Sequence, residues 1–129
     1  MQPKIASERK EVIKMALKKL NKFLYFDCDE FFAKKKFISI GQQVWKDFNS
    51  GNVLGTKVEV VIAQDKTDYG LAESENINNL YEKLIIKVSK QITIPMNVEV
   101  RPINAVATVY GDYRNQLSII AEDIEIISK

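Results

Sequence analysis

The sequence predicts a mainly β protein, a small closed sheet preceded by one amphipathic helix. Apolar residues recur at a spacing of two in several stretches, which places them on one face of a strand. The stretch 97–128 contains two such arms joined by a turn. Within its second arm the apolar positions change parity, from Leu117 and Ile119 to Ile124 and Ile126. Such a change requires a bulge or bend, and bulges let small sheets curl into barrels.

Length and composition indicate a single globular domain. The chain has 129 residues, of which 46% are hydrophobic and 28% charged, as in ordinary globular proteins. No apolar run approaches the roughly 20 residues that span a bilayer, so we expect no membrane insertion. The N-terminus lacks the order of a signal peptide. The single cysteine, Cys28, has acidic neighbours that raise a thiol pKa, and we interpret it as an incidental thiol in the cytoplasm.

The chain contains no histidine. This absence removes the commonest general base, the Ser/His and Cys/His nucleophile pairs and the commonest zinc ligand, so we expect a non-enzymatic protein without a cofactor. Asp27, Asp29 and Glu30 have the oxygen ligands that magnesium prefers. No second acidic motif accompanies them, and a solvated connector is the favoured interpretation.

The N-terminal part of the chain is basic. Residues 1–36 carry ten basic and five acidic side chains, a net charge of +5. Because the whole chain carries +2, residues 37–129 carry −3. We therefore divide the chain into a basic helix with its connector (1–36) and a β-barrel domain (37–129). A polyanion is expected to meet the first part before the second.

Residues 7–24 are predicted to form the amphipathic helix. Ser7 is a suitable N-cap, and the apolar positions keep helical spacing. Lysines at intervals of four form a basic stripe: Lys10, Lys14, Lys18 and Lys22. We favour packing of this helix on the domain, with its lysines in solvent. A phosphate-facing stripe, a contact with anionic membranes and a docking helix for a partner remain alternatives.

Three strands are predicted before the final hairpin. The first covers 37–48, where Gly41 marks a bend. The second covers 57–63 and is followed by a long polar connection over 64–79. The third covers 80–88. No helix fits between the third strand and the hairpin.

The final hairpin is predicted to turn tightly at Gly111-Asp112 and to bend at Glu122-Asp123. Glycine supplies the positive φ that a two-residue hairpin turn requires. Two aromatic side chains and a guanidinium surround the turn, those of Tyr110, Tyr113 and Arg114. The hairpin therefore presents a tip suited to binding.

Five strands in this order, with a bent first strand and a long final hairpin, are typical of an OB-type barrel. Such barrels bind oligonucleotides across strands two and three, between the loops that join strands one to two and four to five. Aromatic side chains stack on bases there, each worth about 1–3 kcal/mol, while cations follow the phosphates. The predicted nucleic-acid-binding residues are Trp45, Lys46, Phe48, Lys57, Lys83, Lys87, Tyr110, Tyr113 and Arg114.

A protein-binding role is the alternative function. OB-type barrels also dock proteins, and the −3 charge of the barrel domain disfavours strong non-specific DNA binding. In this interpretation the barrel and the basic helix form an adaptor that does not touch nucleic acid. We favour binding of single-stranded DNA.

The chain resembles a family of small proteins of Gram-positive conjugative elements and plasmids, the helicase processivity factor (HelP-like) family. Three segments carry the resemblance, ITIP at 92–95, VEVRPINAVATVYGDY at 98–113 and IIAEDIEII at 119–127. The basic N-terminal helix and the long acidic connection at 64–79 depart from the family pattern.

The resemblance implies an OB-like fold and an accessory role in the DNA processing of a mobile element. It also implies a helicase or a relaxase as the protein partner. The family has no catalytic residues to transfer to this chain. Neither the resemblance nor the residues fix the oligomeric state, and a homo-oligomer remains open.

Overall fold

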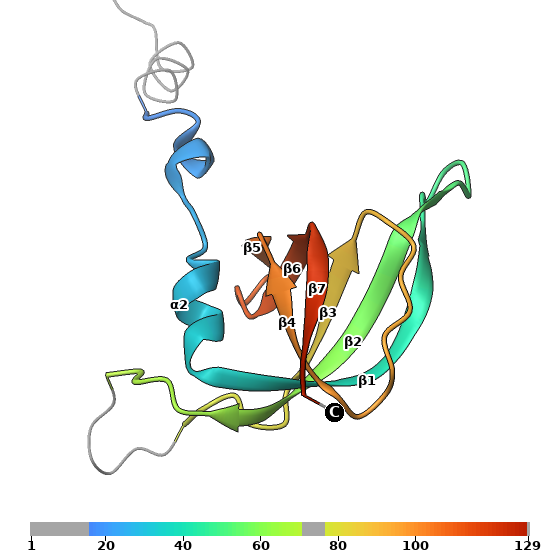
Figure 1. The fold of residues 1–129 in the computed structure, drawn as a ribbon. Coiled ribbons are helices and arrows are strands. Elements are labelled where there is room, and N and C mark those ends of the chain that lie inside the picture. The colour runs from blue at the N-terminus through green and yellow to red at the C-terminus, as the bar shows by residue number, and fades with distance from the viewer. Residues whose placement is uncertain (1–15, 71–76, 129) are drawn as a thin grey trace, which may run out of the picture.

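The described part of the protein, seen in a computed structural model, is mainly β with one short α-helix (Figure 1). The structure describes residues 16–70 and 77–128. The elements are the 3₁₀ helix η1 (Leu20–Phe23), helix α2 (Cys28–Ala33), and strands β1 (Lys35–Lys46), β2 (Val53–Asp65), β3 (Lys83–Val88), β4 (Glu99–Ile103), β5 (Val106–Tyr110), β6 (Gln116–Ala121) and β7 (Asp123–Ser128). The predicted mainly β class is confirmed.

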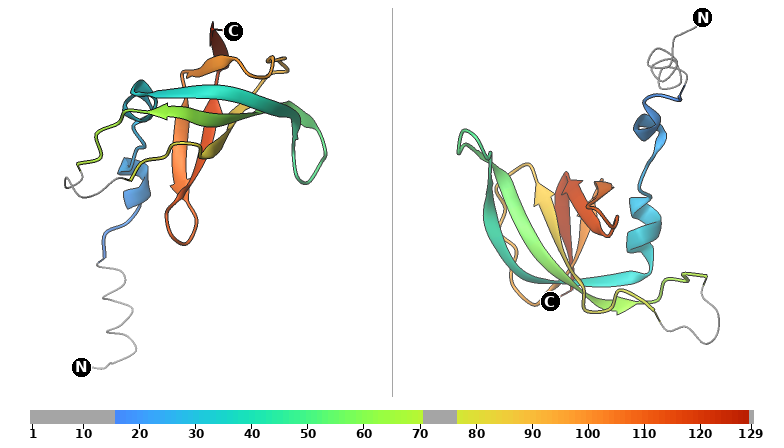
Figure 2. Two further views of the ribbon diagram at one scale, coloured as in Figure 1. Left: turned by 90° about the horizontal axis from the view of Figure 1, so that it is seen from below. Right: turned by 180° about the vertical axis from the view of Figure 1, so that it is seen from behind.

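All seven strands belong to one sheet, in the order β5-β6-β3-β2-β1-β4-β7. Every neighbouring pair is antiparallel except β3 and β6, which run parallel. Only residues 104–105 separate β4 from β5, and only Glu122 separates β6 from β7. The final hairpin therefore bends in both arms and supplies both edges of the sheet. The sheet is strongly curved, with β1 and β2 wrapping round the other strands (Figure 2).

The predicted strands are present, with different ends. The first strand begins and ends two residues earlier than predicted, and its pairing with β2 shifts register between Ser39 and Gly41. The second extends beyond 57–63 in both directions. The predicted bend at Glu122-Asp123 is confirmed by the break between β6 and β7.

The predicted tight turn of the final hairpin is wrong. Tyr110 pairs with Gln116, so that a five-residue loop, 111–115, joins β5 to β6. Gly111 has a φ of 92° and accepts a hydrogen bond from the backbone N–H of Arg114 at 3.1 Å. The loop thus keeps glycine at its first position but needs three more residues than predicted.

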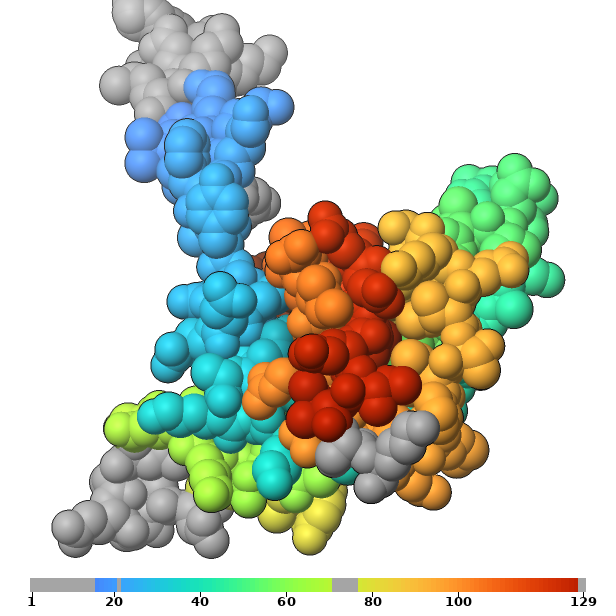
Figure 3. All heavy atoms as spheres, viewed as in Figure 1, coloured from blue at the N-terminus to red at the C-terminus, as the bar shows by residue number. Residues whose placement is uncertain are grey.

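The helix predicted over 7–24 is not formed in its described part. Residues 1–15 lie outside the described residues, and 16–24 contain only η1. Lys19 adopts a φ of 61°, a left-handed conformation that interrupts an α-helix. Apolar side chains of this segment are exposed rather than packed, with Leu17 at 79% and Phe23 at 72% of full exposure. In the space-filling view the segment stands off the sheet as an arm (Figure 3).

The predicted connector 25–36 instead contains α2. The side chain of Asp27 caps the helix by accepting a hydrogen bond from the backbone N–H of Glu30 at 3.0 Å, and acidic residues in the first turn favour the helix dipole. Phe32 is buried and its ring packs on that of Phe37, with centroids 4.9 Å apart. Burial and the nearby acids raise the pKa of Cys28.

The core lies between the curved strands and α2. It consists of apolar side chains from α2, from the segment before β4 and from strands β1, β2, β3, β4, β6 and β7: Cys28, Phe32, Phe37, Val58, Val60, Ile62, Ile86, Val88, Val98, Val100, Ile119, Ala121 and Ile124. The alternation of buried residues along β2 leaves the intervening positions on the outer face of the sheet.

A buried ion pair joins the beginning of β1 to the end of β2. Lys35 and Asp65 are register partners, and Nζ of Lys35 lies 3.7 Å from Oδ1 of Asp65. The same ammonium group donates hydrogen bonds to the carbonyl of Phe31 at 3.1 Å and to Oγ1 of Thr67 at 2.9 Å. One lysine therefore ties α2, both strands and the following connection together.

Asp65 is also held by groups of that connection. It accepts hydrogen bonds from the hydroxyl of Tyr69 at 2.6 Å and from the backbone N–H groups of Asn79 at 2.8 Å and Thr67 at 3.1 Å. Burial alone would raise the pKa of Asp65, but the hydrogen bonds from these three partners outweigh it and lower the pKa to about 2. The carboxylate is consequently ionised at neutral pH.

The free energy of unfolding is expected to depend on pH through the titration of the Asp65 carboxylate. Because its pKa is about 2 in the folded state and about 3.9 when unfolded, its contribution is complete above about pH 4 and is lost as the pH falls toward 2. The urea concentration at the midpoint of unfolding should decrease between pH 5 and pH 3. This decrease should be larger in the unsubstituted protein than in Asp65→Asn. An equal fall in both proteins would contradict the assignment.

A second prediction concerns the glycine at which β2 approaches β3. A Cβ at Gly55 would lie 1.8 Å from the carbonyl oxygen of Val88, whereas a Cβ at Gly41 would meet only a side-chain oxygen at 3.6 Å. Gly55→Ala should therefore lower the free energy of unfolding by about 3 kcal/mol. Gly41→Ala, the matched control, should cost less than about 1 kcal/mol. Chemical denaturation checks both, and equal effects would disprove the steric account.

Candidate nucleic-acid interface

The outer face of β2 and β3 collects the lysines predicted from sequence. Antiparallel pairing places Lys57 directly opposite Lys87, and Lys83 opposite Val61. Val58 and Val60 between these positions are buried, so the lysine side chains belong to the outer face. Glu59 shares this face, opposite Ile85. Three lysines and one acid leave the face basic.

The pair of Lys57 and Lys87 is costly for the fold by itself. Like charges directly opposite each other on neighbouring strands destabilise a sheet. Neither lysine forms an ion pair with a carboxylate among the residues that the structure describes. An anion between the two ammonium groups would reduce their electrostatic repulsion. The pair therefore favours an anionic ligand at this place.

Trp45 borders the same lysines from β1. It pairs with Gly55, which has no side chain, and its ring lies 5.4 Å from Nζ of Lys87. An ammonium group at this distance from an indole ring is attracted by its π electrons. Trp45 is half-buried, so part of the ring is held by the protein and part is available to a ligand.

Two neighbouring grooves extend this face toward the final hairpin. The first, of about 480 Å³, is lined by Lys83, Tyr110 and Arg114, among others. The second, of about 440 Å³, is lined by Lys57, Lys87 and again Tyr110. Tyr110 thus lines both grooves, each of which also contains lysine or arginine side chains.

Four predicted residues line neither groove, and of these Trp45 lies beside a groove residue, Lys87. Phe48, in the loop between β1 and β2, is 99% exposed, and Tyr113, in the loop between β5 and β6, is 87% exposed. Lys46 is exposed at the end of β1. Figure 2 shows that these two loops project from separate places on the sheet. The structure therefore brings together six of the predicted residues, Trp45, Lys57, Lys83, Lys87, Tyr110 and Arg114.

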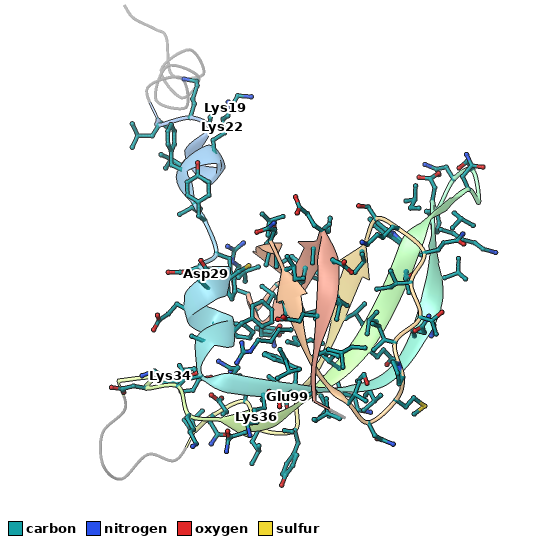
Figure 4. The ribbon with its side chains drawn as sticks, viewed as in Figure 1. Lys19, Lys22, Asp29, Lys34, Lys36 and Glu99 are labelled. Atoms are coloured by element: carbon teal, nitrogen blue, oxygen red, sulfur yellow. The ribbon has the colours of Figure 1, made fainter. Side chains whose placement is uncertain are left out.

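The basic N-terminal arm does not join this face in the described residues. Lys19 and Lys22 extend from η1, away from the sheet (Figure 4). No helix of the described chain is long and apolar enough to cross a membrane. Nor do three or more Cys, Asp or Glu side chains gather into a metal-binding group within 16–70 and 77–128.

Sequence reasoning missed the amides at the first groove. Asn79, Asn115 and Gln116 line it together with Phe26 and Phe31. Asn79 belongs to the polar connection before β3, Asn115 ends the hairpin loop and Gln116 begins β6. Their polarity was visible in the sequence, but the fold alone brings these separate segments to one groove.

Comparisons with known proteins identify no relative of this chain. No protein-family model, curated protein or solved structure matches it. Function is therefore inferred from the residues on the outer face of β2 and β3.

Proposed function

We propose that the protein binds single-stranded DNA across the outer face of β2 and β3. The observation that carries the proposal is the unneutralised pair Lys57 and Lys87, which lies beside the half-buried Trp45 and the exposed Tyr110. Cations that follow a phosphate backbone beside rings that stack on bases are what sequence-tolerant binding of single strands requires.

An OB-type barrel is the fold that we propose for this sheet. If β4 with β5 and β6 with β7 are each counted as one bent strand, five strands remain. The first then pairs with the second and the fourth, and the third with the second and the fifth. The fourth and fifth pair with each other. This circle of neighbours supports a closed five-stranded barrel.

In the proposed complex, bases stack on Tyr110 and Trp45. Lys57 and Lys87 contact two adjacent phosphates between the rings, and Lys83 and Arg114 contact phosphates beyond Tyr110. The exposed loop residues Lys46, Phe48 and Tyr113 meet the strand only where it leaves the face. The site needs no catalytic residue and no cofactor.

A cellular role in DNA processing follows from the resemblance described above. We propose that the protein acts as an accessory factor of a conjugative element or plasmid, with a helicase or relaxase as its partner. Single-stranded DNA is the substrate that such enzymes generate, so the two proposals agree.

Protein docking is a second candidate function, with an observation of its own. The arm before α2 exposes large apolar side chains, including Tyr25 at 86% of full exposure, and carries lysines but no acid from 16 to 26. Exposed apolar residues gathered on one segment are typical of protein-binding surfaces. Removal of residues 16–25, which line neither groove, would abolish partner capture but not DNA binding.

Fluorescence anisotropy with a labelled oligo-dT tests the main proposal. Lys57→Gln combined with Lys87→Gln should weaken binding at least about tenfold at low salt, because two phosphate contacts are lost. The slope of log affinity against log salt should become shallower by about 1.4. The melting temperature should not fall, since a repulsive pair is removed.

The control is a double variant with the same change in charge, Lys36→Gln with Lys66→Gln. Both lysines are exposed and lie outside the two grooves. It should retain nearly full affinity. Equal weakening in both double variants would indicate a general effect of net charge, and absence of binding by the unsubstituted protein at low salt would refute the proposal.

A further inference from the structure

Asn79 lines the first groove from a position fixed by hydrogen bonds. Its backbone N–H donates to Oδ2 of Asp65 at 2.8 Å, and its side-chain Nδ2 donates to Oη of Tyr69 at 2.9 Å. Asp65 in turn is held by the buried Lys35. The side chain at the groove is thus supported by groups that are themselves anchored in the fold.

The orientation of the Asn79 amide follows from the proton of Tyr69. The hydroxyl of Tyr69 has one proton, and it donates that proton to Asp65 at 2.6 Å. Because the pKa of Asp65 is lowered to about 2, the carboxylate is ionised and accepts only. Toward Asn79 the Tyr69 oxygen can then only accept, so Nδ2 must face it. The amide oxygen is turned away from Tyr69.

Among residues 16–70 and 77–128, the amide oxygen Oδ1 of Asn79 keeps its full capacity to accept hydrogen bonds. Within the described residues, no group donates to Oδ1 of Asn79. A held acceptor at the rim of a groove favours ligands that carry a donor. The groove can therefore select a ligand by a hydrogen bond as well as by its shape.

The remaining lining suits one nucleobase. Apolar side chains such as Phe31 and Leu84 form part of the wall, the ring of Tyr110 another, and the cations Lys83 and Arg114 complete the lining. A volume of about 480 Å³ lies within the range of small-ligand sites, which combine apolar walls with a few polar groups. A base can enter the groove while its phosphate contacts Lys83 and Arg114.

We propose, on the basis of the function proposed above, that this groove takes one unstacked base and that Oδ1 of Asn79 accepts a hydrogen bond from its exocyclic amino group. Adenine and cytosine carry such a group at N6 and N4, where guanine carries the carbonyl oxygen O6 and has its amino group at N2 instead. Thymine and uracil carry a carbonyl oxygen at that place, and two acceptor oxygens facing each other repel. The protein therefore prefers strands that offer an amino base to this groove.

Two oligonucleotides that differ in one base test the inference. One is a twelve-residue oligodeoxyuridine, and the other has a single deoxycytidine at its centre. Cytosine and uracil share size and shape but differ at the exocyclic position. The unsubstituted protein should bind the second oligonucleotide about fivefold more tightly, the gain that one net hydrogen bond provides.

Two variants locate the effect. Asn79→Ala removes both the hydrogen bond to cytosine and the repulsion with uracil, so it should bind both oligonucleotides equally, with an affinity between the two values of the unsubstituted protein. Tyr69→Phe keeps Asn79 but removes the oxygen that orients its amide, so the preference should shrink as the affinity for oligodeoxyuridine rises. A purely structural role for Asn79 would weaken both oligonucleotides alike.

Each outcome separates this inference from the function on which it rests. Equal binding of both oligonucleotides by the unsubstituted protein would overturn the base preference and leave single-strand binding intact. A preference that persists in Asn79→Ala would overturn the role of Asn79. Failure to bind either oligonucleotide at low salt would overturn the proposed function itself.

Discussion

The buried pair of Lys35 and Asp65 is the interaction on which the rest of the structure depends. Two charges in a core are tolerated only when each is paired and hydrogen-bonded, and loss of one partner costs about 3–5 kcal/mol. Here the pair fixes the first register position of the β1–β2 hairpin. Arg101 of β4 donates to the carbonyl of Lys35 at 2.8 Å, so a third strand is joined to the same point. Through Tyr69 the carboxylate also orients Asn79 at the candidate groove.

Much of the sheet could be predicted because its strands alternate cleanly. The buried Val58, Val60 and Ile62 carry the period of two that identified the second strand. The errors arose where tertiary contacts decide. The six-residue helix α2 has too few residues to be stable alone and depends on its cap and on the packing of Phe32. Helical spacing in the arm was overridden by the left-handed Lys19.

The candidate site was predictable in part for the same reason. Alternation alone assigned Lys57, Lys83 and Lys87 to the outer face. It could not place Lys57 opposite Lys87, because register depends on the turns and bulges between strands. Nor could it bring Asn79 to the hairpin, since that contact depends on how the connection before β3 is anchored to Asp65. Loop residues such as Phe48 were the least predictable, because strand alternation says nothing about where a loop extends.

The bent final hairpin has a consequence for how the chain folds during synthesis. Its two arms pair with β1 and with β3, strands that leave the ribosome much earlier. Until residue 121 has emerged, β3 lacks its parallel partner and the core lacks Ile119 and Ala121. Pairings between segments so distant in sequence form slowly, and unpaired strand edges promote aggregation in the meantime. The nascent chain therefore carries an exposed β3 edge for longer than its size alone would suggest, and β3 is where a chaperone would be needed most.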